Sequence, residues 1–388
     1  MSVSSERLKR LVMLGAAHSL NHSLFVIAPP ILGLIMVGLN VSKTDIGIVT
    51  TTASFIYGIG ALIGGPLGDK IGESRTIIVS LGFSGIATVL MLLAGATGII
   101  YIYALALVLM ALWASLYHPT ANSLISKSFS GRVSESMGIH GVGGTLGVVA
   151  TPTVAWFIAA RYGWPWAFVT FGVLSIVLAV FFALTFRKNE NSGNAAGGLL
   201  DALKIRELWV LLVFNVAVGL FMKGVELFFP TFLKENRLID PMWASIAFTL
   251  VLACGVPAQW VGGKAADVFG SRKVLIATST GICLSLLSLL FFPLYSVGIG
   301  LFIVLYGFSF YAHQPALNSL TGFCCPPNQR GAVYGIFFFT SFGVGSISQV
   351  ISGYLGDLYG LNVAFYLLTI FAVIALILSF WLPKKREK

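Results

Sequence analysis

Long apolar stretches dominate this chain and limit what it can fold into. Twelve of them are long enough to cross a bilayer, whose hydrocarbon core takes about 20 residues of helix. They run over residues 10–37, 45–67, 75–95, 98–126, 135–160, 165–186, 207–233, 241–262, 273–293, 297–323, 332–357 and 362–382. The runs are continuously apolar, so we expect an all-α membrane protein with twelve transmembrane helices. They leave no room for a soluble domain, and we expect no enzymatic activity.

The ionisable side chains within these stretches are concentrated in a few of them. Apart from His140 in the fifth span, the charged and imidazole side chains away from the ends of the stretches fall in the first, fourth, seventh and tenth spans. They are His18, His22, His118, Lys223, Glu226 and His313. A titratable group in lipid is costly, so it usually faces a water-filled path or a partner. This distribution predicts one central cavity lined by four spans, which is the outline of a membrane transporter.

The composition agrees with a membrane protein, and the distribution of charge explains its basicity. Charged residues make up 10% of the chain, against about 25% in soluble domains. The net charge of +10 would also suit a nucleic-acid-binding protein. With the N-terminus inside, however, 19 of the 24 lysines and arginines lie on the cytoplasmic side, as the positive-inside rule requires. We therefore expect a multi-pass protein of the cell (plasma or inner) membrane, with both termini cytoplasmic and no nucleic-acid partner.

The chain divides into halves that repeat each other. The longest polar stretch, residues 187–206, has the composition of a flexible linker. It separates residues 1–186 from residues 207–388. The sequence Pro119-Thr-Ala-Asn-Ser-Leu in the fourth span recurs as Pro315-Ala-Leu-Asn-Ser-Leu in the tenth. Six spans repeated in parallel predict two six-helix bundles related by a pseudo-two-fold axis along the membrane normal.

A glycine-rich polar motif follows the second span. Residues 65–75 read Gly-Pro-Leu-Gly-Asp-Lys-Ile-Gly-Glu-Ser-Arg. Residues 263–273, after the eighth span, keep an aspartate, a glycine and an arginine at the matching places. The motif resembles the signature loop of the major facilitator superfamily, Gly-x-Leu-Ala-Asp-Arg-x-Gly-Arg-Lys. Glu73 and Ser74 depart from it, because basic residues are usual at these two places.

This resemblance implies a major facilitator fold with loops that latch one conformational state. An aspartate at the N-terminus of a neighbouring helix is favoured by the helix dipole, and such a contact can break in another state. The gating candidates are Gly65, Asp69, Lys70, Gly72, Arg75, Gly263, Asp267, Gly270 and Arg272. The alternative is a tight polar turn with no gating role.

Two histidines in the first span share one helix face. His18 and His22 are four residues apart, which is about one helical turn. They suit a proton-titratable pair that faces the substrate, because imidazole titrates near neutral pH. The alternatives are a metal site and simple packing. A metal site is disfavoured because no carboxylate or cysteine accompanies them in the sequence.

The seventh span holds one ammonium and one carboxylate near mid-membrane. Lys223 and Glu226 are three residues apart, which allows them to pair on one helix face. Either the pair is static, or it is switchable. In a switchable pair, Glu226 takes a proton and Lys223 is freed to hold an anionic group. The proton-coupling candidates are therefore Glu226, His22 and His18.

Prolines in the fourth and tenth spans predict matched kinks beside polar side chains. Pro119 and Pro315 each remove a backbone hydrogen bond, which kinks a helix and frees a carbonyl. The kinks are either purely structural or part of a binding site, and their matched places favour a site. The substrate-binding candidates are Asn21, His118, Asn122, Lys223, His313, Gln314 and Asn318.

Further stretches resemble one branch of the superfamily. The first span reads His-Ser-Leu-Asn-His at 18–22, and the fourth and fifth spans contribute Tyr-His-Pro at 117–119 and Gly-Val-Gly-Gly at 141–144. They resemble the fosmidomycin-resistance branch of efflux proteins, which implies export. The fifth span also loosely resembles the glycine-proline signature of drug–proton antiporters. Glycines at this spacing serve plain helix packing equally well.

These features predict secondary active transport of a small solute by alternating access, coupled to protons and directed outward. Lys223 and the imidazoles favour an anionic or polar solute. Proton-coupled uptake of a small organic anion is an alternative, and a membrane protein with histidine-ligated metal or haem is an alternative of another class. No Gly-x4-Gly-Lys-Ser/Thr motif for ATP is present. We expect no cofactor and no resident metal, a lipid bilayer around the protein, and a monomer.

Overall fold

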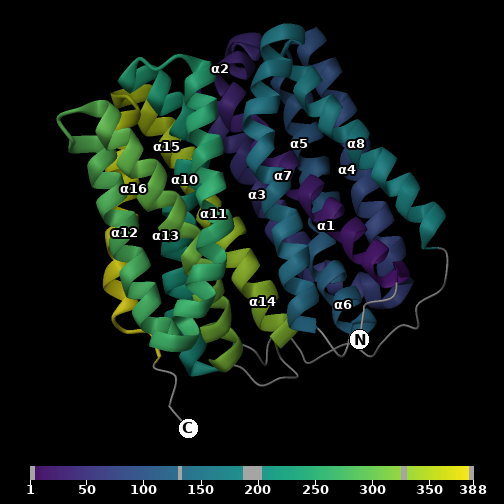
Figure 1. Ribbon diagram of the computed structural model, residues 1–388. Coiled ribbons are helices and arrows are strands. Elements are labelled where there is room, and N and C mark those ends of the chain that lie inside the picture. The colour runs from purple at the N-terminus through teal and green to yellow at the C-terminus, as the bar shows by residue number, and fades with distance from the viewer. Residues whose placement is uncertain (1–4, 130–132, 187–202, 325–329, 384–388) are drawn as a thin grey trace. The chain divides into compact units, whose positions relative to one another are not determined.

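The computed structural model describes residues 5–129, 133–186, 203–324 and 330–383 (Figure 1). Over these residues the chain is helical and contains no strand. It forms two compact units. Unit 1 comprises Met1–Val41 and Thr52–Ala195, and unit 2 comprises Ser42–Thr51 and Ala196–Lys388. The predicted linker at 187–206 lies largely outside the described residues, so the division at that linker stays a prediction.

The helices of the first half follow the apolar runs, because a backbone in lipid must satisfy its own polar groups. They are α1 (Ser5–Val26), α2 (Ala28–Leu39), α3 (Lys43–Ile71), α4 (Glu73–Thr97), α5 (Ile100–Ala114), α6 (Tyr117–Ser128), α7 (Val133–Tyr162) and α8 (Trp164–Thr185). The first predicted span is thus two helices, bent by 41° at Ile27. Pro29 and Pro30 follow the bend and cannot donate the backbone hydrogen bonds that would continue α1.

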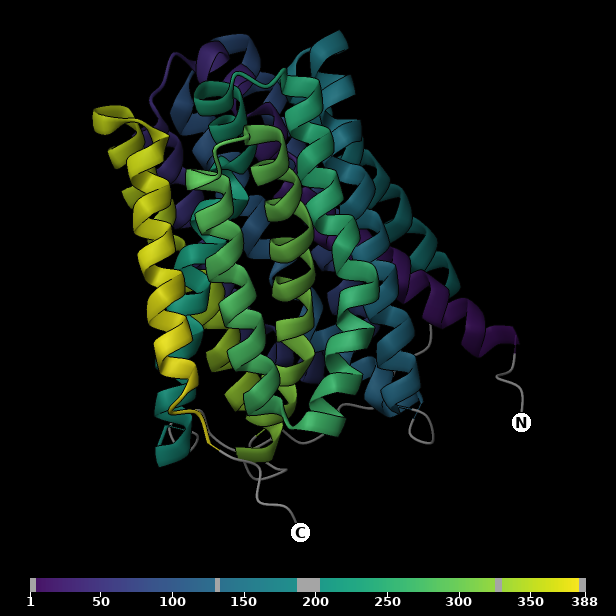
Figure 2. The same ribbon diagram turned by 60° about the vertical axis from the view of Figure 1, so that its left-hand side comes forward.

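The second half begins with four long helices, continues with a broken span and ends with one further helix. Its elements are α10 (Arg206–Arg237), α11 (Pro241–Phe269), α12 (Ser271–Phe291), α13 (Tyr295–Cys324), α14 (Arg330–Phe338), the π-helix η2 (Phe339–Gly343), the 3₁₀ turn η3 (Val344–Ser346), α15 (Ile347–Tyr359) and α16 (Leu361–Ser379). In Figure 2 the yellow α16 stands beside the green α12, and it packs against both α12 and α10. Counting the bent α1–α2 pair as one, the described residues hold up to 12 spans.

Single glycines make the tight turns between several helices. Gly72 separates α3 from α4, and Gly270 separates α11 from α12, with φ of 97° and 88°. Gly163 and Gly360 do the same before α8 and α16, with φ of 95° and 83°. A side chain is strained at such φ values, which glycine adopts freely. The polar motifs predicted as loops at 65–75 and 263–273 are therefore helical except for one residue each.

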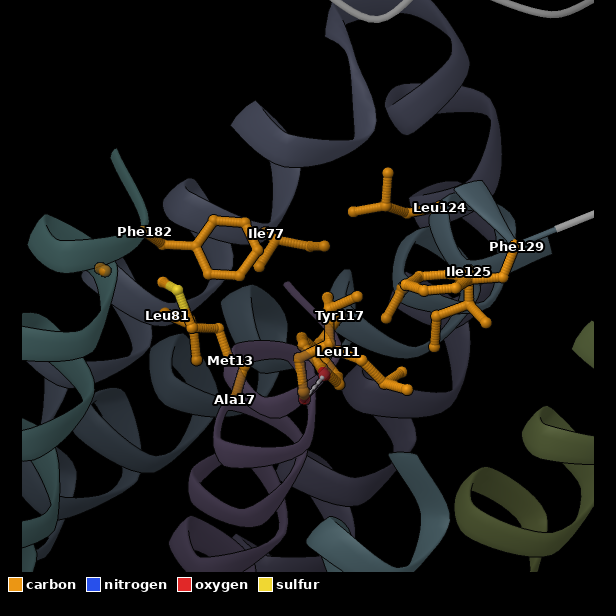
Figure 3. Close-up of a cluster of buried hydrophobic side chains, with 13 residues drawn as sticks. Leu11, Met13, Ala17, Ile77, Leu81, Tyr117, Leu124, Ile125, Phe129 and Phe182 are labelled. Carbon is orange, nitrogen blue, oxygen red and sulfur yellow. Dashed lines mark hydrogen bonds between the residues drawn. The ribbon is translucent and has the colours of Figure 1, made fainter. Parts of the chain in front are cut away.

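A cluster of buried apolar side chains joins α1, α4, α6 and α8 in unit 1 (Figure 3). Leu11, Ile77, Ile125 and Phe182 represent the four helices, and each is at most 2% exposed. Tyr117 also packs in this cluster. Its hydroxyl donates a hydrogen bond to the carbonyl oxygen of Leu14 at 2.6 Å. The cluster fixes the first turn of α6 against α1, which positions the polar groups that follow.

Candidate functional site

Unit 1 contains a cluster of four imidazoles from three helices. His18 and His22 lie one turn apart on α1, His118 lies in the first turn of α6, and His140 lies on α7. The ring centroid of His18 is 4.7 Å from that of His22, 4.9 Å from His118 and 4.1 Å from His140. The rings of His22 and His118 are 4.8 Å apart. The structure thus groups three histidines chosen from sequence with His140, which the span pattern had left aside.

Hydrogen bonds orient two of these rings. Nδ1 of His18 lies 2.9 Å from the backbone carbonyl oxygen of His140. A carbonyl oxygen only accepts, so Nδ1 carries the proton, and the lone pair of the neutral ring is on Nε2. The hydroxyl of Tyr117 lies 2.9 Å from Nε2 of His140. Because that hydroxyl already donates to Leu14, it accepts from His140.

Glycines on α7 allow this helix to approach α1 closely. A Cβ atom on Gly143 would lie 2.6 Å from the Cα atom of Gly15. A Cβ atom on Gly144 would lie 2.5 Å from Nδ1 of His18, closer than any real contact of this kind. The glycine-rich segment of the fifth span therefore packs α7 against α1 and makes room for the His18 ring.

We expect Gly143→Ala to destabilise unit 1 and Gly141→Ala, on the same helix, to leave it stable. A Cβ atom at Gly141 would meet nothing within 4 Å. Overpacking at Gly143 should cost about 1–3 kcal/mol, whereas alanine at an open helical position is slightly favourable. Thermal unfolding of the two variants in the same detergent measures the difference. Equal midpoints for both variants would contradict this packing.

Asn21 of α1 contacts the break in the fourth span. The helix stops at Ala114 and restarts at Tyr117, just before Pro119, as expected for a proline that cannot donate. The amide of Asn21, which is 1% exposed, donates to the carbonyl oxygen of Ala114 at 2.8 Å. In the tenth span, by contrast, α13 continues through Pro315 without a break. The predicted pair of matched kinks is therefore visible as a helix break only in the fourth span.

Unit 2 contains a largely buried ion pair on α10. Nζ of Lys223 donates to Oε2 of Glu226 at 2.7 Å, the contact that their spacing predicts. Lys223 is only 4% exposed, whereas the Glu226 side chain keeps 25% of its surface exposed. Nζ also lies 4.3 Å from the ring centroid of Phe342, a cation–π contact. The ammonium is thus held by one carboxylate and one aromatic face.

The ring of Phe342 belongs to the π-helix η2, which interrupts the eleventh span. The amide of Asn215 donates to the carbonyl oxygen of Phe337 at 2.8 Å and to Oγ1 of Thr340 at 2.9 Å. A Cβ atom on Gly219 would lie 2.5 Å from the carbonyl oxygen of Ser341. Short π-helical segments often mark functional sites. Sequence analysis missed Asn215, although its spacing of eight residues from Lys223 places both on one face of α10.

Aromatic residues of α13 lie close to α10. The phenol groups of Tyr306 and Tyr311 lie near enough to Glu226 to interact with it electrostatically. His313 is 1% exposed and stacks on Phe214 at 5.3 Å between ring centroids. Over the described residues, neither ring nitrogen of His313 has a hydrogen-bond partner. The tenth span thus brings tyrosines as well as the predicted histidine close to α10.

Several other candidates from the sequence are more exposed than the residues of these two clusters. Asn122 and Asn318 are exposed, and Gln314 is half-buried. In the motif segments Lys70, Arg75 and Asp267 are exposed, and the guanidinium of Arg272 donates to the carbonyl oxygen of Phe380. The side chains of Gly65 and Asp69 lie outside the described part of the structure. Gating by these segments, together with Gly72, Gly263 and Gly270, stays a prediction.

A buried carboxylate in the first motif escaped the sequence analysis. Glu73, in the first turn of α4, is 0% exposed and accepts a hydrogen bond from Oγ of Ser123 at 3.0 Å. The helix dipole favours an anion in a first turn. The sequence did mark this residue as unusual, because Glu73 stands where the superfamily motif has a basic residue. The hydrogen bond between Glu73 and Ser123 links α4 to α6.

Asp357 of α15 caps the start of α3 within unit 2. Its carboxylate accepts hydrogen bonds from the backbone amides of Lys43 and Thr44 at 3.1 and 2.7 Å. These amides are the first donors of α3 and have no partner inside the helix. Nζ of Lys43 lies 3.2 Å from Oε2 of Glu235 on α10. These contacts explain why residues 42–51 group with unit 2.

The chain matches a known protein family over most of its length. The family description Major Facilitator Superfamily matches residues 13–349. The chain belongs to this superfamily. Among its relatives, this major facilitator protein is 23% identical over 388 residues to the fosmidomycin resistance protein of Escherichia coli, covering 96% of this chain and 92% of the relative. It is 24% identical over 278 residues to a probable sulfoacetate transporter of Cupriavidus necator, covering 65% and 63%.

Solved structures give the same fold at low sequence identity. A bacterial homologue of the human lysosomal transporter Spinster matches with a TM-score of 0.82 at 16% identity, covering 98% of this chain and 97% of that chain. The nucleoside transporter NupG matches with a TM-score of 0.80 at 16% identity, covering 96% and 99%. The protein is therefore an all-α secondary transporter of a small solute in a lipid bilayer. It is not an enzyme, and a metal- or haem-dependent membrane protein of another class is not favoured.

Proposed function

We propose that this transporter exports a small anionic solute and couples its movement to protons through Lys223 and Glu226. The observation that carries the proposal is the 2.7 Å ion pair within α10, with its ammonium almost fully buried. Buried ion pairs cost desolvation free energy, and a packed apolar pair is often at least as stable. A pair kept at mid-span is therefore better explained by a transport role than by stability.

The pair acts as a switch with two states. With Glu226 ionised, its carboxylate holds Lys223 and leaves no place for an anion. A proton on Glu226 removes that negative charge, and the ammonium then donates to the anionic group of the solute. The ring of Phe342, 4.3 Å from Nζ, can hold the ammonium while Glu226 is protonated. Release of the proton restores the pair and displaces the solute.

The relatives support the direction and the chemical class. The relative matched over nearly the whole chain is called a resistance protein, which favours export. The second is called a probable sulfoacetate transporter, which favours a small organic anion. The positive-inside distribution of lysine and arginine supports a place in the cell membrane with both termini in the cytoplasm. We propose that the protein works there as a monomer.

The experiment that tests this function starts from the detergent-solubilised protein. Thermal shift against fosmidomycin, sulfoacetate and neutral analogues of similar size identifies an anion that stabilises the fold. Everted vesicles, in which the cytoplasmic face is outside, are then supplied with that radiolabelled anion in an outside medium more acidic than the lumen. We expect accumulation that a protonophore abolishes. Accumulation only in right-side-out vesicles would favour uptake, and accumulation insensitive to the protonophore would contradict proton coupling.

We also propose that the repeated motifs bias the conformational equilibrium. Asp69→Asn and Asp267→Asn keep side-chain size but remove charge, which weakens a helix-terminus contact by about 0.3–2 kcal/mol. A shift of this size changes the population of two states without touching the solute site. The expected result is slower transport and altered alkylation of a cysteine introduced at the exposed Asn318 in a background without other cysteines. Normal transport with unchanged alkylation would mean that the motifs are only turns.

A further inference from the structure

Three imidazoles in unit 1 have the composition and spacing of a metal-binding group. His18, His22 and His118 each offer one ring nitrogen, and these nitrogens all lie within 4.8 Å of one another. They come from two helices, α1 and α6, whose packing is fixed by the apolar cluster of Figure 3. No part of the proposed switch on α10 contributes to this group.

The surroundings of His18 add an independent observation. Its Nδ1–H donates to the backbone carbonyl oxygen of His140 at 2.9 Å. Metal-binding histidines commonly donate their second ring nitrogen to a carbonyl or carboxylate, which fixes the tautomer and the ring orientation. Here the bond leaves the Nε2 lone pair of the neutral ring available as a ligand. Gly144 makes room for the ring in this position.

We propose that His18, His22 and His118 bind a divalent transition-metal ion of the zinc class. Zinc bonds imidazole nitrogen at about 2.0–2.1 Å, so a tetrahedral site needs the three nitrogens roughly 3.3 Å apart. From the observed limit of 4.8 Å, an approach of up to roughly 1.5 Å is needed, and rotation of the side chains would supply it. Magnesium and calcium ions do not suit this site, because they prefer oxygen ligands and the site offers imidazole nitrogens.

The site binds the ion through three neutral groups and leaves a coordination position open. Three imidazoles carry no compensating negative charge, so the bound ion keeps its full charge. Water or a small anion completes the coordination, as in zinc sites with three histidine ligands. The ion would join α1 to α6 within unit 1. This role differs from that of a metalloenzyme or haem protein, and it does not depend on proton coupling at Glu226.

Direct titration with zinc tests the site. The protein is purified in detergent, any affinity tag is removed, and its thiols are alkylated so that cysteines cannot bind the ion. Calorimetry should then detect one saturable zinc site per chain. His18→Gln, His22→Gln and His118→Gln should each weaken binding by about tenfold or more, the scale of losses seen even for outer-shell partners of metal sites. His313→Gln, which removes a buried imidazole from unit 2, is the matched control and should bind as the parent does.

Cobalt binding provides a second readout. It uses the parent protein alone, so it does not depend on whether a variant folds. Cobalt bound to the parent protein should show visible absorption bands typical of tetrahedral coordination by nitrogen and oxygen, and zinc should displace it. Absence of saturable zinc binding by the parent would overturn the proposal. So would equal affinity in all the variants, or an octahedral cobalt spectrum identical to that of cobalt in buffer.

Discussion

Glu226→Gln is expected to abolish proton-driven accumulation of the solute while leaving solute exchange in place. Glutamine keeps the shape of the side chain and a hydrogen-bonding oxygen for Lys223, but it cannot take up or release a proton. The ammonium then faces no negative charge on this side chain, so the anion can always bind to it. Exchange of labelled for unlabelled solute needs no net proton movement, so it should continue, whereas accumulation against a gradient should fall to background.

Glu207→Gln is the matched control for this experiment. Glu207 lies in the first turn of the same helix and is exposed. Its substitution removes the same charge and should leave both accumulation and exchange near the parent level. If Glu226→Gln accumulates solute as well as the parent does, proton coupling does not occur at Glu226. Loss of both accumulation and exchange, in a variant with parental thermal stability, would make Glu226 a binding residue instead.

Lys223→Gln should weaken binding of an anionic solute far more than binding of a neutral analogue. A hydrogen bond to a charged group contributes about 1.5–3 kcal/mol, which corresponds to roughly 10- to 150-fold in affinity. The neutral analogue has no anionic group for Lys223 to hold, so the substitution should change its affinity little. Binding to the purified protein, measured by calorimetry with each ligand, gives the two ratios.

Lys234→Gln serves as the control for charge alone. Lys234 is an exposed lysine near the other end of α10, so its removal changes the net charge without touching the pair. It should preserve affinity for both ligands. Equal losses for the anion and the neutral analogue in Lys223→Gln would reduce Lys223 to a structural partner of Glu226.

The parts of this molecule that depend on local geometry could be predicted from its sequence. Long apolar runs predict membrane helices, because a backbone in lipid has no other way to satisfy its polar groups. The contact between Lys223 and Glu226 follows from helical spacing alone. The clustering of His18 with His118 was predictable in outline, because both fall in spans expected to line one cavity.

Contacts set by close helix packing could not be predicted in the same way. His140 joins the imidazole cluster because Gly143 and Gly15 let α7 approach α1, and the order of residues along one span does not reveal that approach. Asn215 is a lone amide in an apolar run, and its partner carbonyl at Phe337 precedes the π-helix, which no periodicity indicated. Residues 65–75 were predicted as a loop because they join two spans and resemble the signature loop of the superfamily. Helices in a membrane tolerate glycine and proline, however, and only Gly72 is a turn.

The most direct test of the Lys223–Glu226 switch is proton movement driven by the solute itself. Proteoliposomes with an entrapped pH indicator receive the anion on one side with no imposed proton gradient. The parent protein should move protons in the same direction as the anion until a gradient opposes further transport, and Glu226→Gln should move none while still carrying the anion. Proton movement by Glu226→Gln equal to that of the parent, at equal anion flux, would contradict the switch.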